Sequence, residues 1–211
     1  MQTTVDRRTL ILAGIIVVLV AAVAFLLGAG LTRDNAVTPV GMMGNASGMG
    51  MHGGATGAGD LSGSDVMFLQ MMIPHHQQAV DMSGLALATS TDEELRALAT
   101  EIRDGQAAEI IQMEGWLADA GLPSDLDHPM GMGMGGMLTD SELATLAGSS
   151  GAPFDSLWLA GMIRHHEGAL HMIGMIQDSA NPDLQEFSES IRVVQTAQIE
   201  QMQDMLVRLA A

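Results

Sequence analysis

One unit of this chain occurs twice, and that repeat restricts the fold more than any other feature of the sequence. Residues 65–82 align with residues 155–172, and farther along residues 102–117 align with residues 191–206. A long recurring unit indicates a supersecondary structure that buries its apolar face against a copy of itself. The chain is therefore expected to contain two similar halves that pack together.

Each half is predicted to be a pair of helices. In the first half, apolar residues recur with helical spacing over 64–89. Residues 91–94 (Thr-Asp-Glu-Glu) have the pattern of a capping box that opens a second helix, and the Gly-Leu-Pro sequence at 121–123 is typical of a helix end. The first half is therefore expected to form a helical hairpin.

The second half repeats this arrangement and adds a short helix. A helix is predicted near 153–178, and Asn181 followed by Pro182 is typical of a helix start. Residues 139–142 (Thr-Asp-Ser-Glu) form a further capping-box pattern between the halves. No segment alternates polar and apolar residues as a strand would. We therefore predict an all-α protein, a four-helix bundle made of two repeated helical hairpins.

Changes in composition place the domain boundaries. The bundle domain is expected over 61–211, and it divides into a first hairpin at 62–120, a Met-rich loop at 121–139 and a second hairpin at 140–211. Residues 32–60 are dominated by glycine, alanine and methionine without periodicity, so they are predicted to form a flexible linker.

A long apolar run precedes the linker. Residues 10–31 contain no charged side chain, and a helix of this length spans about 33 Å, enough to cross a bilayer. Arg7 and Arg8 lie just before the run, so residues 1–9 are expected to stay in the cytoplasm and everything after the span to lie outside. The alternative is a secretory signal that is cleaved. Both interpretations place the bundle domain outside the cytoplasm, with the cell membrane as the partner of an uncleaved anchor.

Composition excludes several classes of function. The net charge of −17, with only 8 basic residues, argues against binding to nucleic acid. The absence of cysteine rules out disulfides, thiolate metal sites and cysteine nucleophiles. In contrast, the chain contains 19 methionines. The sulfur available for chemistry is therefore thioether sulfur.

Two His-His pairs occupy equivalent places in the first helix of each hairpin. Methionines precede and follow each pair at spacings that place them on the same helix face or its edges. The candidate ligands are His75, His76, His165, His166, Met72, Met82, Met162 and Met172. Pro74 precedes the first pair and is expected to bend that helix, whereas its counterpart in the second half is Arg164.

Imidazole and thioether together form a soft, neutral set of ligands. Such a set favours Cu(I), with Ag(I) and Cu(II) as further possibilities, while a zinc site made by the histidines alone stays open. Carboxylate di-iron sites in helical bundles use Glu-x-x-His, which this sequence lacks. Because free imidazole titrates near pH 6.5, copper held by the paired histidines is expected to weaken between about pH 7 and 5.

A second cluster of possible ligands lies between the hairpins. Glycines separate its methionines, so the backbone can fold tightly around a small ion. Its candidate ligands are His128, Met130, Met132, Met134 and Met137. A methionine-rich glycine loop has no evident role in packing, so it is predicted to be a metal-capturing segment.

The two M-I-x-H-H-x-x-A-x-x-M segments, each followed by I-R-x-x-Q-x-x-x-I-x-x-M, resemble the domain of unknown function 305 family over about residues 61–210. The resemblance implies a ferritin-like four-helix bundle, secretion or membrane anchoring, and an association with copper handling. It also implies that the paired histidines and their flanking methionines are the site residues. One departure is that Glu109 in the first half is matched by Gln198 in the second, so the two halves need not be equivalent.

The expected function is that of a copper-binding protein, tethered to the membrane, that sequesters Cu(I) or passes it on. Its partners would be metal ions and a copper-transport or copper-resistance protein. No nucleophile–base arrangement or phosphate-binding loop is evident, so an enzyme is not expected. Two alternatives remain from other classes: a ferritin-like metallo-oxidase of Cu(I), and a metal-free helical interaction module.

Overall fold

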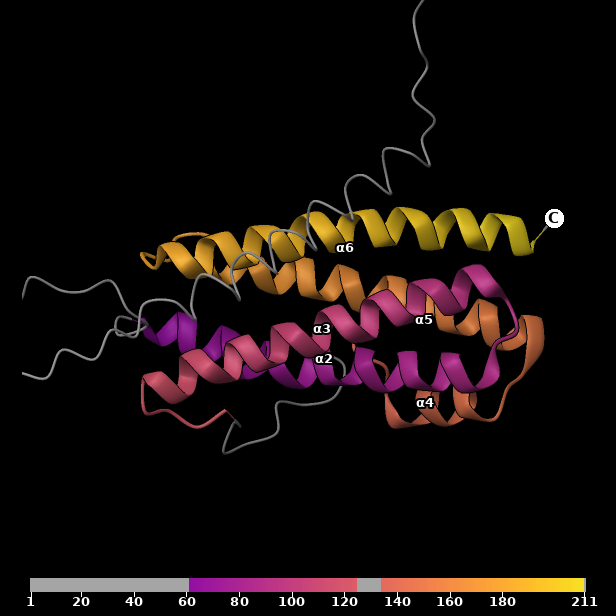
Figure 1. The fold of residues 1–211 in the computed structure, drawn as a ribbon, viewed down its shortest axis with the longest axis horizontal. Coiled ribbons are helices and arrows are strands. Elements are labelled where there is room, and N and C mark those ends of the chain that lie inside the picture. The colour runs from indigo at the N-terminus through magenta and orange to yellow at the C-terminus, as the bar shows by residue number, and fades with distance from the viewer. Residues whose placement is uncertain (1–60, 125–133, 211) are drawn as a thin grey trace, which may run out of the picture. The chain divides into compact units, whose positions relative to one another are not determined.

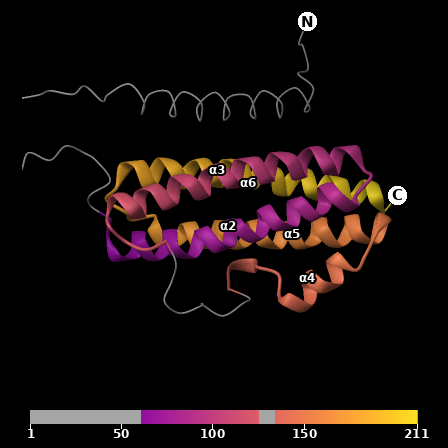
Figure 2. The same cartoon turned by 60° about the horizontal axis from the view of Figure 1, so that its bottom comes forward.

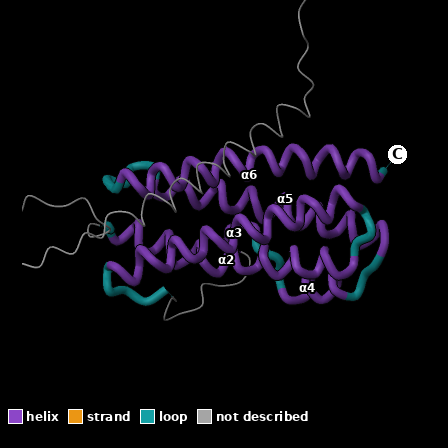
Figure 3. The backbone as a smooth tube through the Cα atoms, viewed as in Figure 1, coloured by secondary structure: helices purple, strands orange, loops and turns teal. Residues whose placement is uncertain are grey.

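A computed structural model describes residues 61–124 and 134–210 of the chain. Every element in these two ranges is helical, and Figure 3 shows no strand in them. The elements are α2 (Gly63–Thr89), α3 (Glu93–Asp119), the 3-10 turn η1 (Met134–Gly136), α4 (Asp140–Ala147), α5 (Gly151–Ile173), the 3-10 turn η2 (Gly174–Ile176) and α6 (Pro182–Leu209). The predicted all-α bundle is confirmed for this part of the chain.

The predicted segments before the bundle domain, at 1–9, 10–31 and 32–60, lie outside the described residues. Among the helices from Gly63 to Leu209, none is long and apolar enough to cross a membrane.

The helix starts follow from local capping chemistry. Ser62 and Asp65 form a reciprocal capping box at α2, and Thr139 and Glu142 form another at α4. Asn181 caps α6 by accepting a hydrogen bond from the backbone N–H of Leu184. These three signals satisfy backbone donors that a helix start would otherwise leave unpaired.

Two predicted boundaries differ from the structure. The N-cap of α3 is Asp92 rather than Thr91, because the Asp92 carboxylate accepts from the backbone N–H of Leu95 at 2.9 Å and pairs with Arg208 at 2.8 Å. The helix predicted near 153–178 begins at Gly151 and ends at Ile173, after which the chain tightens into η2.

The end of α3 is a Schellman motif. Gly121 has a positive φ of 70°, its N–H donates to the carbonyl of Ala118, and the N–H of Leu122 donates to the carbonyl of Leu117. The predicted stop signal is confirmed at this position.

The four long helices form a bundle with one long connection. Figure 1 shows that α2 and α3 run in opposite directions, as do α5 and α6, and that α5 begins at the opposite end of the bundle from the end of α3. The connection between the hairpins must therefore travel the length of the bundle. In Figure 2, α2 and α5 lie in the lower part and α3 and α6 in the upper part, with α4 below α2 and α5. Helix α2 packs against both α3 and α5.

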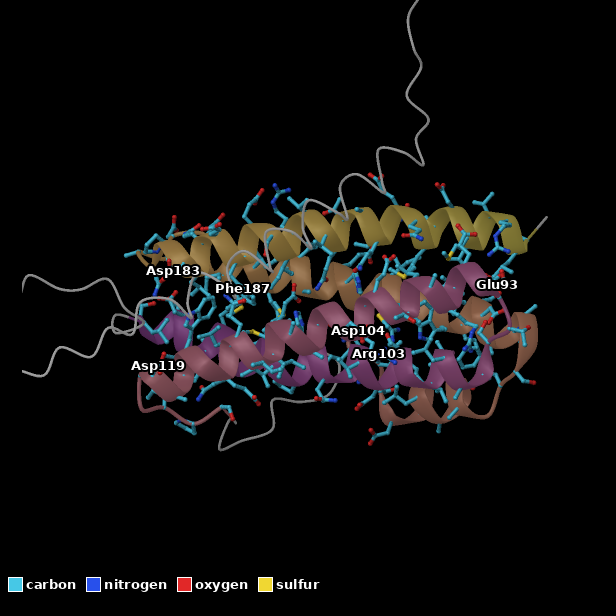
Figure 4. All side chains as sticks on the ribbon, viewed as in Figure 1. Glu93, Arg103, Asp104, Asp119, Asp183 and Phe187 are labelled. Carbon is cyan, nitrogen blue, oxygen red and sulfur yellow. The ribbon has the colours of Figure 1, made fainter. Side chains whose placement is uncertain are left out.

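The core consists of two apolar clusters, one toward each end of the bundle. One contains Phe154, Trp158 and Met202, and the other contains Phe68 and Phe187. Figure 4 shows several sulfur atoms between the helices, whereas Arg103 and Asp104 lie on the outer side of α3. The space between the two apolar clusters holds polar side chains.

Candidate metal centre

A layer of polar side chains crosses the bundle between the two apolar clusters, and it is called the polar layer below. Each long helix contributes two members that lie on adjacent residues or one turn apart. The members are His75 and His76 from α2, Gln106 and Glu109 from α3, His165 and His166 from α5, and Gln195 and Gln198 from α6. The four histidines and the two glutamines Gln106 and Gln195 are all buried. The repeat therefore brings its two His-His pairs together in one place.

Every histidine in the layer uses Nε2 for a hydrogen bond. The Nε2 of His75 donates to the carbonyl oxygen of Gly135 at 2.7 Å, and the Nε2 of His165 donates to the carbonyl oxygen of His75 at 2.9 Å. A carbonyl oxygen can only accept, so the proton of both neutral rings lies on Nε2. The lone pair of each ring is therefore on Nδ1.

The other two histidines pair with equivalent positions of the second helices. The Nε2 of His76 lies 2.8 Å from Glu109 Oε2, and the Nε2 of His166 lies 2.9 Å from Gln198 Oε1. The two halves thus have the same geometry but a different charge. A carboxylate supports one histidine and a neutral amide supports the other.

The Nδ1 atoms of all four histidines are buried and have no hydrogen-bond partner. A buried polar atom without a partner is costly and usually marks a place where a ligand or an ordered water completes the site. The side-chain amides of Gln106 and Gln195 are likewise buried without partners. The polar layer therefore offers lone pairs that nothing within the described residues satisfies.

Burial keeps the rings neutral. It lowers the pKa of His75 to about 3, with a further lowering by the neighbouring His76. Burial lowers the pKa of His166 to about 4 and that of His165 well below its usual value. These three imidazoles are uncharged at neutral pH, which is the form that binds metals.

The candidate methionines are buried, but they pair across the repeats. Met72 and Met172 belong to the apolar cluster that contains Phe68, whereas Met82 and Met162 belong to the cluster that contains Trp158. Because α2 and α5 run in opposite directions, each side of the polar layer receives one methionine from each half. The prediction of methionines on both sides of the histidines is consistent with this placement.

The end of the Met-rich loop lies over the histidines. Residues 134–138, called the strap below, follow the α2 and α5 surface. Gly135 and Gly136 have positive φ values of 66° and 78°. The position where a Cβ of Gly135 would lie is 3.3 Å from Met172 Sδ and 3.4 Å from the His75 ring. At Gly135 the strap therefore lies against both a thioether and the Cδ2 edge of an imidazole ring.

One glutamine fixes the strap to α2. The Gln78 side chain donates through Nε2 to the carbonyl of Leu138 at 2.9 Å and accepts from the N–H of Leu138 at 2.7 Å. Glycines allow the strap to approach α5, because a Cβ on Gly168 would collide with the carbonyl of Gly135. The sequence analysis did not identify Gln78 or the strap glycines as structural residues. Gln78 lies only two residues after the His-His pair.

The predicted Met-rich loop site is described only in part. Met134 begins η1, and Met137 is half-buried in the strap. His128, Met130 and Met132 lie outside the described residues. Metal binding by this loop stays a prediction.

The histidines do not form a ready-made site with many ligands. Within residues 61–124 and 134–210, no three histidine, aspartate or glutamate side chains converge where they could hold a metal ion. An ion in the polar layer would therefore be held by one or two imidazoles together with thioethers. Alternatively, a rotation of the imidazole rings would bring more of their nitrogen atoms to the ion. Neutral Nδ1 lone pairs beside buried methionines suit a soft ion such as Cu(I) better than a hard one.

Sequence comparison identifies the fold family. The family described as "Domain of unknown function (DUF305)" matches residues 65–206, which include both His-His pairs and both second helices. The chain belongs to the DUF305 family. No curated protein matches it.

Solved structures of DUF305 proteins resemble this DUF305 domain. A DUF305 fragment from Deinococcus radiodurans is 32% identical with a TM-score of 0.65, covering 70% of this chain and 97% of the fragment. A DUF305 protein from Streptomyces coelicolor is 34% identical with a TM-score of 0.64, covering 70% of this chain and 92% of that protein.

CopM also resembles this DUF305 chain. Its Cu(I)-bound form is 28% identical with a TM-score of 0.59, covering 70% of this chain and 98% of CopM. CopM has further been solved in Cu(II)-bound and Ag-bound forms. The structural neighbours thus include a protein that holds the ions that the donor atoms of the polar layer favour.

Proposed function

We propose that this DUF305 protein binds Cu(I), and by the same chemistry Ag(I), in the polar layer of its bundle, and that it sequesters or transfers the ion. The observation that carries the proposal is the set of four buried histidine Nδ1 atoms without partners. Folding leaves four lone pairs unsatisfied at one level of the core, which is unfavourable unless something occupies them.

The surroundings favour a soft monovalent ion. Burial keeps His75, His165 and His166 neutral, so they bring no charge that would repel a cation. Met72 and Met172 supply thioethers on one side of the layer, and Met172 and His75 both border Gly135 of the strap. The carboxyl group of Glu109 lies 2.8 Å from His76 Nε2 and places an acidic side chain beside the layer. The likeness to CopM, solved with Cu(I), Cu(II) and Ag, supports the same choice of ions.

The cellular setting belongs to the same proposal. The apolar run at 10–31 after Arg7 and Arg8 supports a single membrane span that holds the bundle outside the cytoplasm. The long connection between α3 and α5 is of the kind that ferritin-like bundles use. We propose that the protein works as a binding protein rather than as an enzyme, with a copper-transport or copper-resistance protein receiving the ion.

The experiment is metal binding by the full chain in detergent. The protein is purified from copper-supplemented cells, its metal content is measured, and the ion is then titrated against a chromogenic Cu(I) chelator. We expect tighter binding of Cu(I) and Ag(I) than of Zn(II) or Fe(II), and loss of most of the affinity in a His75→Gln/His165→Gln variant. Exposed His171→Gln is the matched control and should behave as wild type.

Two outcomes would contradict the proposal. A wild-type protein that is folded but binds neither Cu(I) nor Ag(I) would indicate a metal-free interaction module. Steady oxygen consumption on addition of Cu(I), lost in the His75→Gln/His165→Gln variant, would indicate a metallo-oxidase.

The membrane anchor is tested separately by adding protease to spheroplasts, which should degrade residues 62–211. Full protection of these residues would contradict the proposed topology.

A further inference from the structure

The first half of α2 and the segment from the end of α5 into η2 carry methionines beyond those that flank the histidines. On α2, Met67, Met71 and His75 follow one another at intervals of four residues, so they form one stripe along the helix. On the neighbouring chain segment, Met172 near the end of α5 and Met175 in η2 continue away from the polar layer in the same direction. Helix α2 packs against both α5 and η2.

These methionines range from exposed to fully enclosed. Met67 is 40% exposed and Met175 is 42% exposed, whereas Met172 is only 4% exposed. Met71 is partly buried and packs against the apolar cluster that contains Phe68. Thioethers therefore lead from the surface of this end of the bundle toward the polar layer.

The inner end of the series reaches a histidine. Met172 Sδ and His75 Cδ2 lie 3.3 Å and 3.4 Å from the position that a Cβ of Gly135 would take, so both side chains border the strap at this glycine. The Nδ1 of His75 is buried without a partner. A soft ion that leaves Met172 would therefore meet the polar layer at His75.

The repeat provides an internal comparison. At the offset of 90 that aligns His165 with His75, the counterparts of Met67, Met71 and Met175 are Leu157, Gly161 and Leu85. These three residues lie toward the other end of the bundle, where Leu138 of the strap comes within 3.2 Å of the position of a Cβ on Gly161. At these three positions, one end of the bundle thus has methionines, whereas the equivalent end has two leucines and a glycine that Leu138 of the strap approaches.

Packing alone does not explain this difference. Leucine serves two of the three positions in the other half, and the exposed Met67 and Met175 gain only part of the free energy that full burial of an apolar side chain would give. A thioether differs from leucine chiefly in its soft, polarisable sulfur, which binds Cu(I) and Ag(I).

We propose that Met67, Met71 and Met175 form an entry and exit path for a soft monovalent metal ion, and that this path leads through Met172 to His75. The inference rests on the proposed function, because it needs the polar layer to bind the ion. It goes further by assigning residues outside the DUF305 motif and by assigning one end of the bundle to metal exchange.

The test compares rates with affinities. In a Met67→Leu/Met71→Leu/Met175→Leu variant, loading with Ag(I) and release to a chelator, followed by stopped flow, should both slow about tenfold, while the equilibrium affinity stays within twofold of wild type. Met202→Leu/Met205→Leu is the control, since both methionines are buried in the other cluster. Methionine-to-leucine changes conserve volume, so both variants should fold.

A second measurement locates the ion. In protein labelled with carbon-13 at the methionine methyl groups, a substoichiometric amount of Ag(I) should shift the NMR signals of Met67, Met71 and Met175.

A triple variant that loads Ag(I) at the wild-type rate, or that slows no more than the control, would overturn the path while leaving the proposed function intact. A wild-type protein that binds no Ag(I) would overturn the proposed function itself.

Discussion

The ring of His165 stacks on the ring of His75 with their centroids 3.7 Å apart, and the same ring donates through Nε2 to the backbone carbonyl of His75 at 2.9 Å. Two imidazolium ions could not share this position, because their charges would repel at such a separation in a buried site. The contact therefore excludes the state in which both rings are protonated. The two halves of the repeat meet at these residues.

Protonation of the polar layer should destabilise the metal-free fold. Burial lowers the folded-state pKa of His75 to about 3 and that of His166 to about 4, and it also lowers that of His165. The unfolded chain takes up these protons near pH 6.5, so the free energy of unfolding falls as the pH drops from about 6.5 toward the folded pKa values. The loss should approach about 2 kcal/mol per histidine at pH 5.

Urea unfolding at pH 7, 6 and 5 measures this slope. Glu142 should not contribute to this slope. Its pKa is lowered to about 2, so its contribution to the free energy of unfolding is lost only in more acidic solution. A His165→Gln variant should show a shallower slope than wild type, and exposed His171→Gln should not. Equal slopes in wild type and His165→Gln would show that the ring is not held neutral.

Metal binding should respond to pH less than the sequence suggested. Free imidazole predicts that binding weakens between pH 7 and 5, but His75 and His166 take up protons only near pH 3 and 4 in the folded protein. We expect the affinity of the folded chain for Ag(I), an ion that does not change oxidation state in this range, to vary less than about threefold from pH 7 to 5.5. A fall of tenfold per pH unit in a chelator competition would show that the ligands titrate as free imidazoles.

The charge difference between the halves should appear as a difference in affinity. Glu109 supports His76, and Gln198 supports His166 in the same geometry. Replacing a carboxylate that supports a metal-binding histidine typically costs about tenfold or more in affinity. Glu109→Gln should therefore weaken Cu(I) binding by about tenfold and Cu(II) binding by more, and Gln198→Glu should strengthen both. The check is competition with chelators for each ion, and identical values in all three proteins would contradict a role for the carboxylate.

The strap should depend on one glycine of α5. In a Gly168→Ala variant the new Cβ collides with the carbonyl of Gly135, so the strap must move or the helix must shift. The expected loss is about 1–3 kcal/mol of unfolding free energy. Gly84→Ala in α2 is the matched control, because nothing lies within 4 Å of its Cβ position, and it should stabilise the protein by about 0.5–1 kcal/mol. Similar effects of the two changes would show that the strap does not press on α5.

Gln78 should keep the strap closed. Gln78→Met removes both hydrogen bonds to Leu138 and leaves a buried backbone N–H and carbonyl without partners. We expect a loss of about 1–3 kcal/mol and faster hydrogen exchange at the amide of Leu138, with little change at Leu98 in the core of α3. Gln77→Met is the control, since Gln77 bonds only to exposed Asp81 among the contacts described for its side chain. An unchanged exchange rate at Leu138 would contradict the role of Gln78.

Sequence periodicity and caps predicted the helices well because those signals are local. Thr139 and Asn181 both lie at the helix starts that the sequence predicted. The N-cap of α3 is Asp92 rather than Thr91, because the Asp92 carboxylate also pairs with Arg208 near the end of α6. This contact joins distant parts of the chain, so no local sequence pattern predicts it.

The site was predictable as a set of residues but not as an arrangement. The repeat identified the histidines, yet it could not show that His165 would donate to the backbone of His75 or that Gly135 would accept from His75. These contacts join segments 90 and 60 residues apart. Gln106 and Gln195 could have been found, because each is a polar residue on the inward stripe of its helix.

The division of the core into two apolar clusters has a consequence for how the protein melts. Each cluster draws on all four long helices, and the layer between them contributes unsatisfied atoms instead of apolar contacts. We therefore expect either end of the metal-free bundle to open locally more readily than the whole bundle unfolds. An ion gripped from both hairpins at the boundary would favour only the state in which both ends are closed. Metal binding would then convert two partly independent unfolding transitions into a single cooperative one, because the bound ion would link the two ends of the bundle through the polar layer.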